Sequence, residues 1–403
     1  MLSHWPLRSC AAYPAMAACI AHALLMAPAA GAAEDPPKGL YQTLSDGTLS
    51  EDLGIDEFGI DAGGWLTVGI NHNFAEPEDR LNSPVSFNDR TDELHLHQLN
   101  LFFERSVDLK SGRFDWGGRF DAMFGTDTPY TQATGHWDDN LIDQKDLRFY
   151  DVALPQAYLE VGLPWGNGLS AKIGHFYSII GYESVPSPPN FFYSHSYSMK
   201  SSPFTHTGAL LSYALRDDLT LYSGAVTGAD NFDRHFGAWS FLGGFNWTAD
   251  DGESGLSFSV LNGDASDTFE DNRTYFTAIW RQLIGQKWHY VLQHDRGWQD
   301  QAFGPGSASA DWYSLVQYLS YDVADSLGAG IRAEWFRDQN GSRYNAGEAG
   351  YYAVTLGLNW KPLSFLTLRP ELRYDWADSA TPAYARGSRD NQLLIGADAV
   401  VEF

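Results

Sequence analysis

The sequence predicts an all-β chain that folds as a closed antiparallel transmembrane β-barrel of about 16 strands. Three observations lead to this fold class. Segments in which apolar and polar side chains alternate recur from residue 64 to the last residue. The connections between these segments are alternately short and long, as in barrels with plain turns at one end and large loops at the other. No apolar run after the first 33 residues approaches the ~18–20 residues of a membrane-spanning helix.

The first 33 residues are typical of a secretory signal peptide. Arg8 supplies a basic start, residues 11–30 are rich in Ala, Leu and Met, and small residues then precede an acidic stretch. We therefore expect a signal peptide at 1–33, an acidic N-terminal periplasmic segment at 34–62 and the outer-membrane barrel at 63–403. Both cysteines lie within the signal, which leaves the mature chain without disulfides or thiol chemistry.

Charge and composition narrow the range of partners. The formal net charge is -25, and so acidic a surface repels phosphate backbones, which argues against nucleic-acid binding. Aromatic residues make up 15% of the chain, including 14 Trp and 21 Tyr, whereas disordered acidic chains lack aromatics. This composition suits short strands with rings of amphipathic aromatic side chains.

The segment 366–376 shows the alternation most clearly. One face carries Leu366, Leu368, Leu372, Tyr374 and Trp376, and the other carries Thr367, Arg369, Glu371, Arg373 and Asp375. Turning this strand around would place Arg369 and Arg373 in lipid, at a cost of about 2–4 kcal/mol each near the midplane. The polar face must therefore point into the barrel.

The same alternation marks the other candidate strands. Together they lie near residues 64–74, 94–105, 114–125, 154–163, 169–177, 206–215, 219–227, 239–248, 255–262, 274–282, 287–295, 312–321, 326–336, 350–360, 365–376 and 392–403. An even number of strands places both termini in the periplasm. A last strand that ends on Phe403 resembles the signal by which the barrel-assembly machinery recognises its clients.

A soluble β-sandwich would also give alternating strands, but the tryptophans argue against it. Bulky aromatics on the apolar faces form two groups, as in the aromatic girdles of membrane barrels. We expect Trp116, Trp247, Trp288 and Trp360 near the short turns, and Trp239, Trp312, Trp335 and Trp376 towards the long loops. Charges of both signs deep within strands also suit a water-filled lumen and not a dry sandwich core.

Several short motifs carry a family resemblance. They are Pro-Gln-Ala-Tyr at 155–158, Gly-His-Phe-Tyr at 174–177, Asn-Phe-Phe-Tyr-Ser-His-Ser-Tyr at 190–197 and Pro-Phe-Thr-His-Thr-Gly at 203–208. With these motifs the chain resembles the OmpL-like β-barrel porins over nearly all of its mature length. The resemblance implies a porin-like barrel of the bacterial outer membrane and implies no defined substrate.

The inner face is expected to carry charges of both signs. Such rings set a transverse electric field that favours small hydrophilic solutes, although the same charges could instead form salt bridges that stiffen the wall. The candidate pore-lining residues are Arg119, Asp121, Glu160, Lys172, Arg281, Arg332, Glu334, Arg369, Glu371, Arg373 and Asp375, with Asp398 on the last strand. We expect passive diffusion of small hydrophilic solutes, with no catalytic residue, cofactor or metal.

The long aromatic connection at 178–205 is the candidate constriction. Proline limits its freedom, and insertion into the lumen would bury its aromatic side chains. The hypothesis is that it folds inwards and narrows the pore, and the alternative is an outer cap packed on neighbouring loops. The constriction candidates are Pro186, Pro188, Phe191, Phe192 and Tyr193, beside Pro189.

Two other functions stay open. A plugged, non-conducting barrel could act as an adhesin, with residues 34–62 as the plug. An outer-membrane hydrolase would need a Ser–His pair, for which Ser194–His195 or Thr205–His206 supply material without a G-x-S-x-G elbow. His95 and His97 share a strand face but lack a third metal ligand. The expected partners are outer-membrane lipid and lipopolysaccharide, and no interface signal decides for or against a homotrimer.

Overall fold

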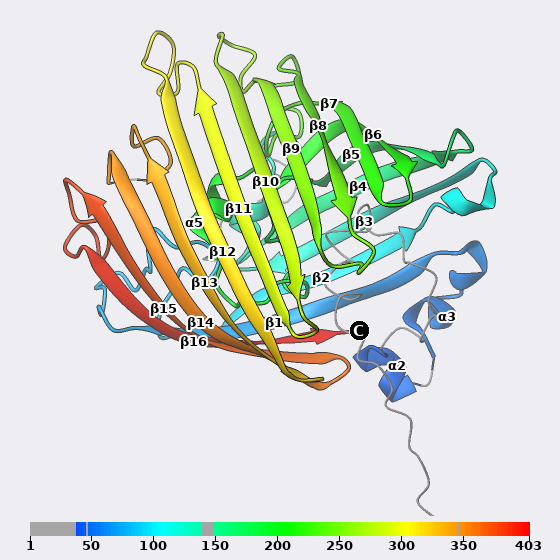
Figure 1. Ribbon diagram of the computed structural model, residues 1–403, viewed down its shortest axis with the longest axis horizontal. Helices are drawn as coiled ribbons and strands as arrows, with labels where there is room; N and C mark the ends of the chain where they lie inside the picture. Colours follow the sequence, from blue (N-terminus) through cyan, green and yellow to red (C-terminus); the bar gives the residue numbers. More distant parts are fainter. Residues whose placement is uncertain (1–37, 46, 139–148, 345) are drawn as a thin grey trace, which may run out of the picture.

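Sixteen antiparallel strands close into one barrel in the computed structural model, which describes residues 38–45, 47–138, 149–344 and 346–403. Each strand bonds to the next along the chain, and β16 returns to bond with β1 (Figure 1). The expected fold class and strand number are therefore confirmed. The predicted signal peptide lies outside the described residues. No helix among those residues is long and apolar enough to cross a membrane.

The strand bounds follow the predicted segments closely. The strands are β1 (Asp61–Asn73), β2 (His95–Arg105), β3 (Asp115–Gly125), β4 (Asp151–Leu163), β5 (Leu169–Tyr177), β6 (Thr205–Arg216), β7 (Leu219–Val226), β8 (Ser240–Thr248), β9 (Gly255–Asp264), β10 (Asn272–Ile284), β11 (Trp288–Gln299), β12 (Ala310–Ala324), β13 (Leu327–Asp338), β14 (Ala349–Leu363), β15 (Leu366–Ser379) and β16 (Asn391–Glu402). The helices are α2 (Leu40–Ser45), α3 (Leu49–Leu53), η1 (Asp56–Phe58), η2 (Leu109–Ser111), α4 (Thr128–Thr131) and α5 (Tyr197–Ser201).

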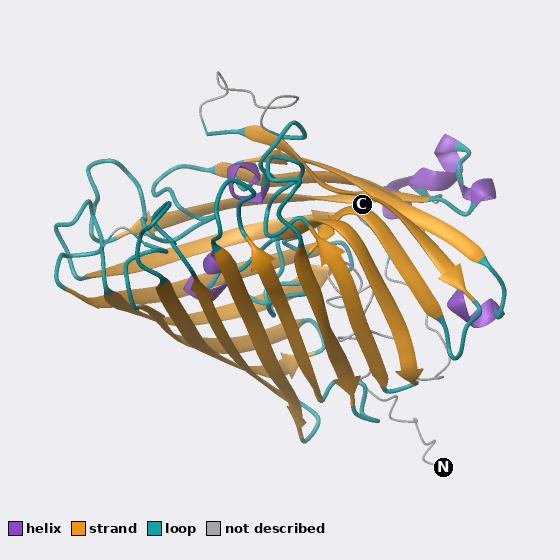
Figure 2. Cartoon of the chain, turned by 90° about the horizontal axis from the view of Figure 1, so that it is seen from above, coloured by secondary structure: helices purple, strands orange, loops and turns teal. Residues whose placement is uncertain are grey.

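Exposure separates the two faces of each strand. In β15, Arg373 and Asp375 are at most 1% exposed, whereas Leu372 and Tyr374 are 40% and 42% exposed. The alternation arises because lipid contacts one face, while the other face meets whatever fills the barrel. Short turns and long loops lie at opposite ends of the barrel, as predicted (Figure 2).

The tryptophans follow the expected outward placement with one correction. Trp116, Trp288 and Trp335 are exposed on the outer face, but Trp312 is 1% exposed and points inwards. In β12 the buried face also carries Ser314 and Val316. Because alternate residues of a strand share one face, the Trp312 indole points inwards as they do. The ring lies over a glycine of β11, Gly297, where even a Cβ atom would be 2.2 Å from it.

The described part of the acidic segment 34–62 lies at the rim of the barrel beside the carboxyl terminus (Figure 1). The Ser364 hydroxyl donates to the Lys38 carbonyl over 2.8 Å, and the Ala62 amide donates to the Ser50 hydroxyl over 2.8 Å. Gly39 packs on Phe403. These contacts hold α2 and α3 at the short-turn end, away from the inserted segment described below.

Replacing Leu372 by Arg should lower the free energy of unfolding by about 2–4 kcal/mol, because the side chain points to lipid near the middle of β15. Leu372→Ala is the control, since it removes the side chain without adding charge. Urea unfolding in lipid vesicles, followed by tryptophan fluorescence, measures both. Equal losses for the two variants would contradict the assignment of this face to lipid.

Candidate pore

The segment 178–204, which joins β5 to β6, crosses the interior of the barrel and bonds to strands on opposite sides. The Ser259 hydroxyl on β9 donates to the Ile179 carbonyl over 3.0 Å, and the Tyr182 amide donates to the Gln293 side chain on β11 over 3.1 Å. Across the barrel, the Gln98 side chain on β2 donates to the Val185 carbonyl over 2.8 Å. Figure 1 shows α5, which belongs to this segment, inside the ring of strands. We call residues 178–204 the inserted segment.

Three wall arginines donate to backbone carbonyls of the inserted segment. Arg332 reaches the Ser194 carbonyl over 2.6 Å, and Arg373 reaches that of His195 over 2.5 Å. Arg369 binds two carbonyls, those of residues 187 and 190, over 2.7 and 2.8 Å. All three guanidinium groups are at most 2% exposed, and a buried cation needs acceptors in place of water.

Two wall glutamates accept backbone amides of the same segment. We call Arg332, Arg369, Arg373, Glu334 and Glu371 together the cradle. Glu371 accepts the Ser194 amide over 2.9 Å, and Glu334 accepts the amides of Tyr197 and Ser198 over 2.9 and 2.8 Å. Each arginine of the cradle also has a carboxylate partner. These ion pairs are Arg332–Glu183 at 2.6 Å, Arg373–Asp375 at 2.8 Å and Arg369–Asp398, whose Nε–Oδ1 distance is 2.9 Å.

The aromatic residues of the inserted segment pack on inward-facing glycines. A Cβ atom on Gly330 would lie 2.5 Å from the ring of Phe191, and one on Gly357 would lie 2.8 Å from that of Phe192. Phe192 is 5% exposed and Phe191 is half-buried. Glycine at these wall positions leaves the space that the rings occupy.

Tyr193 anchors the segment to the first strands. Its hydroxyl lies 2.7 Å from Nε2 of His97, whose Nδ1 lies 3.0 Å from Asp127. The tyrosine ring sits against Gly69 of β1 and Gly396 of β16. This buried chain of polar groups joins the segment to the point where the barrel closes.

The prolines and the neighbouring histidine show how the segment holds its own shape. The Pro186 carbonyl accepts from Ser184 and Asn190, both over 2.9 Å, while Pro188 is half-buried. His195 packs edge-on against Phe87 at 4.5 Å between ring centres. Burial lowers the pKa of His195 to about 4, so the ring is uncharged at neutral pH.

The remaining predicted pore-lining residues lie on the strands outside the cradle. Arg119 binds Glu104 over 2.5 Å and Asp121 over 2.6 Å. Within the described part of the chain, Lys172 of β5 and Arg281 of β10 lack such a carboxylate partner. Glu160 is half-buried beside Lys172, its neighbour in register.

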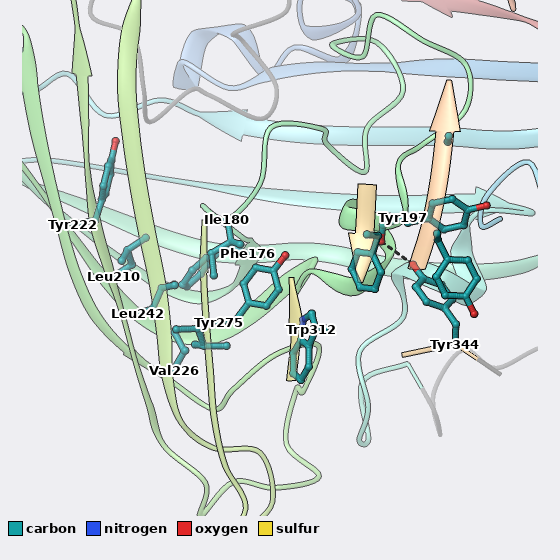
Figure 3. Close-up of a cluster of buried hydrophobic side chains, with 14 of the residues drawn as sticks. Phe176, Ile180, Tyr197, Leu210, Tyr222, Val226, Leu242, Tyr275, Trp312 and Tyr344 are labelled. Atoms are coloured by element: carbon teal, nitrogen blue, oxygen red, sulfur yellow. Dashed lines mark hydrogen bonds between the residues drawn. The ribbon is translucent and has the colours of Figure 1, made fainter. Parts of the chain in front are cut away.

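A buried apolar cluster inside the barrel was not predicted. Leu210, Leu242 and Leu261 point inwards and pack with Ile180 of the inserted segment and with Tyr275 (Figure 3). The inward face of β6–β10 is therefore polar only in part, whereas the alternating pattern predicts a polar inner face. The sequence of β8 could have indicated this cluster, because the adjacent Phe241 and Leu242 make both faces of the strand apolar.

Among the described residues, neither proposed hydrolase pair assembles a catalytic triad. The Ser194 hydroxyl accepts from Arg332 over 3.0 Å, and Nδ1 of His195 has no hydrogen-bond partner. The Ser178 hydroxyl lies 2.9 Å from Nε2 of His206, but Nδ1 of that ring faces the Gly228 carbonyl at 2.7 Å and no carboxylate. The Thr205 hydroxyl donates to Asp230. Among the described residues, no group of three or more His, Cys, Asp or Glu could hold a metal ion.

Comparison with known proteins decides the family. A family model described as "Putative beta-barrel porin-2, OmpL-like" matches residues 59–403. The chain belongs to this family. The predicted resemblance is confirmed, and the chain is an outer-membrane porin. A search of curated proteins found no match.

Solved porin structures share the fold of this OmpL-like porin. OprB of Pseudomonas putida has a TM-score of 0.58 and 12% identity, covering 92% of this chain and 99% of its own. OmpT of Vibrio cholerae, in its trimer form, gives 0.55 and 12%, covering 85% and 99%. The channel DcaP of Acinetobacter baumannii gives 0.54 and 14%, covering 85% and 97%. At such low identity these likenesses concern the fold alone.

Replacing Arg369 by Met should destabilise the protein by about 3–5 kcal/mol, because Asp398 would be left buried without its partner. The loss of two bonds to the inserted segment should also speed chymotrypsin cleavage between residues 191 and 193. Urea unfolding and cleavage rates in vesicles measure these effects. Arg386→Met is the control, since Arg386 is 70% exposed in its pair with Asp79. Equal effects of the two substitutions would contradict the cradle.

Proposed function

We propose that this porin is a passive diffusion channel for small hydrophilic solutes, and that the inserted segment narrows its pore. One observation supports the proposal most directly. Side chains on the inner wall of β13–β15 form hydrogen bonds with the backbone of residues 187–198. Because the backbone itself is bound, the segment keeps a fixed path across the barrel. The solutes must then pass between this segment and the free part of the wall.

Orientation and partners extend the same proposal. The short turns and both chain ends would face the periplasm, with the long loops outside the cell, as is usual for bacterial barrels. The outer apolar face would contact outer-membrane lipid and lipopolysaccharide, and β16 would be read by the barrel-assembly machinery. Because OmpT, a similar fold, is described in a trimer form, a homotrimer is the assembly to test first.

A non-conducting barrel is the second candidate, and one observation favours it. In the loop-end half of the barrel, inward residues such as Leu242, Tyr275 and Trp312 are at most 2% exposed. A barrel filled in this way could serve as an adhesin. Planar-bilayer recording separates the candidates, because a wild-type protein that carries no current while the segment-deleted protein conducts would support the plugged barrel.

Deleting residues 186–197 should raise the single-channel conductance in planar bilayers, because the deletion removes the part of the inserted segment that lies against β13–β16. Deletion of residues 303–307, in the connection between β11 and β12, is the control, since that connection is largely exposed. The control should conduct like the wild type. Unchanged conductance after the first deletion would overturn the constriction.

A further inference from the structure

The inner wall of β5–β10 differs from the rest of the barrel in its charges. Along these six strands the inward-facing positions carry no carboxylate, and all these strand residues are described. The charged inward residues are Lys172, Arg273 and Arg281. The opposite wall carries an excess of acids. Its inward carboxylates include Glu104, Asp121, Glu160, Asp295, Glu334, Glu371, Asp375 and Asp398.

Among the described residues, no carboxylate lies within ion-pair distance of Lys172, which is 6% exposed. Its ammonium group lies 4.0 Å from the ring centre of Tyr158 and 5.9 Å from that of Phe176. Glu160, opposite in register on β4, and Glu104 are near enough to act on this charge, but neither forms an ion pair with it. Leu210 is the neighbour on the other side. The aromatic rings stabilise the cation without using its N–H donors.

Arg281 also has no carboxylate partner among the residues that the structure describes. Its Nη2 makes one long bond of 3.4 Å to the Asn246 side chain, and its Nε is buried without a partner. The closest acidic influence is Asp251 in the turn between β8 and β9, whose carboxylate already accepts from the Ser254 hydroxyl and amide. Arg281 as a whole residue is partly exposed.

Neutral polar side chains lie beside Arg281. Ser257, Asn246 and Thr220 are successive partners in register on β9, β8 and β7, beside Arg281. Ser257 and Thr220 are partly exposed. Hydroxyl and amide groups can donate hydrogen bonds to a passing anion and carry no charge that repels it.

Other lumen arginines show why this wall is different. Four other inward arginines each form an ion pair with a carboxylate, which neutralises their charge within the protein. They are Arg119, Arg332, Arg369 and Arg373. A salt-bridge lattice therefore explains those four residues and leaves Lys172 and Arg281 unexplained. Arg273 lies at the loop end, away from the other two cations, and its Nε donates to the Gln299 side chain over 2.8 Å.

We propose that small oxyanions, either carboxylates or phosphate, pass along the short-turn end of the inner wall of β5–β10, where the charges of Lys172 and Arg281 attract them. This inference rests on the proposed channel function and names its solute class. The transverse charge difference would hold an anion against the β5–β10 wall and away from the acidic wall. Specificity then comes from two unpaired cations in a protein whose total charge is strongly negative.

The experiment measures reversal potentials of the full-length protein in bilayers across a KCl gradient. The variant Lys172→Gln with Arg281→Gln should lower the chloride-to-potassium permeability ratio by about threefold or more, because two attracting charges are lost. Lys172→Arg with Arg281→Lys should keep the wild-type ratio. The matched control is Lys110→Gln with Arg113→Gln, which removes the same charge from an exposed turn and should leave the ratio near wild type.

Added solutes then identify the oxyanion. Acetate and inorganic phosphate, applied in separate recordings, should each reduce the chloride current of the wild type, and the stronger block identifies the favoured group. The double Gln variant should show neither block. The double Gln variant must still conduct and migrate as a folded protein on gels. If it then keeps the wild-type permeability ratio and the wild-type block by acetate and phosphate, the anion path alone is overturned. A wild-type protein that carries no current would instead overturn the channel function, and the inference with it.

Discussion

The interior of this barrel depends on the matching of buried charge with backbone. Arg332, Arg369 and Arg373 face inwards, where water would solvate them if the lumen were open at that level. The inserted segment takes the place of that water with carbonyl groups, and Glu334 and Glu371 take up its amides. Each partner would be costly to bury alone, so wall and segment depend on each other.

The strands could be predicted because lipid imposes a local rule. In β15 the outward positions from Leu366 to Trp376 are apolar and the inward positions from Arg369 to Asp375 are charged, so the sequence alone gives its two faces. The insertion hypothesis was also within reach, since a long connection with Phe191, Phe192 and Tyr193 needs cover. Neither inference requires knowledge of which distant residues meet.

The contacts inside the barrel could not be predicted, because they depend on which distant residues meet. Tyr193 meets His97, and Ile180 packs in the cluster with Leu242, across long sequence separations that no period reveals. Trp312 was placed outside because aromatic girdles are common, while its alternation with Ser314 and Val316 already pointed inwards. Strands whose two faces are both apolar indicate that something other than water fills the barrel.

Net charge is a poor guide to what such a channel selects, because most of its charges are already paired. The total of -25 includes loop and turn carboxylates in contact with bulk water, whose field salt screens within about 8–10 Å. Inside the barrel, a charge acts on a solute only if no fixed partner cancels it. Lys172 and Arg281 meet that condition and Arg119 does not, although all three face inwards. Selectivity in a crowded lumen should therefore follow the inward charges that have no fixed partner and not the sum over the sequence.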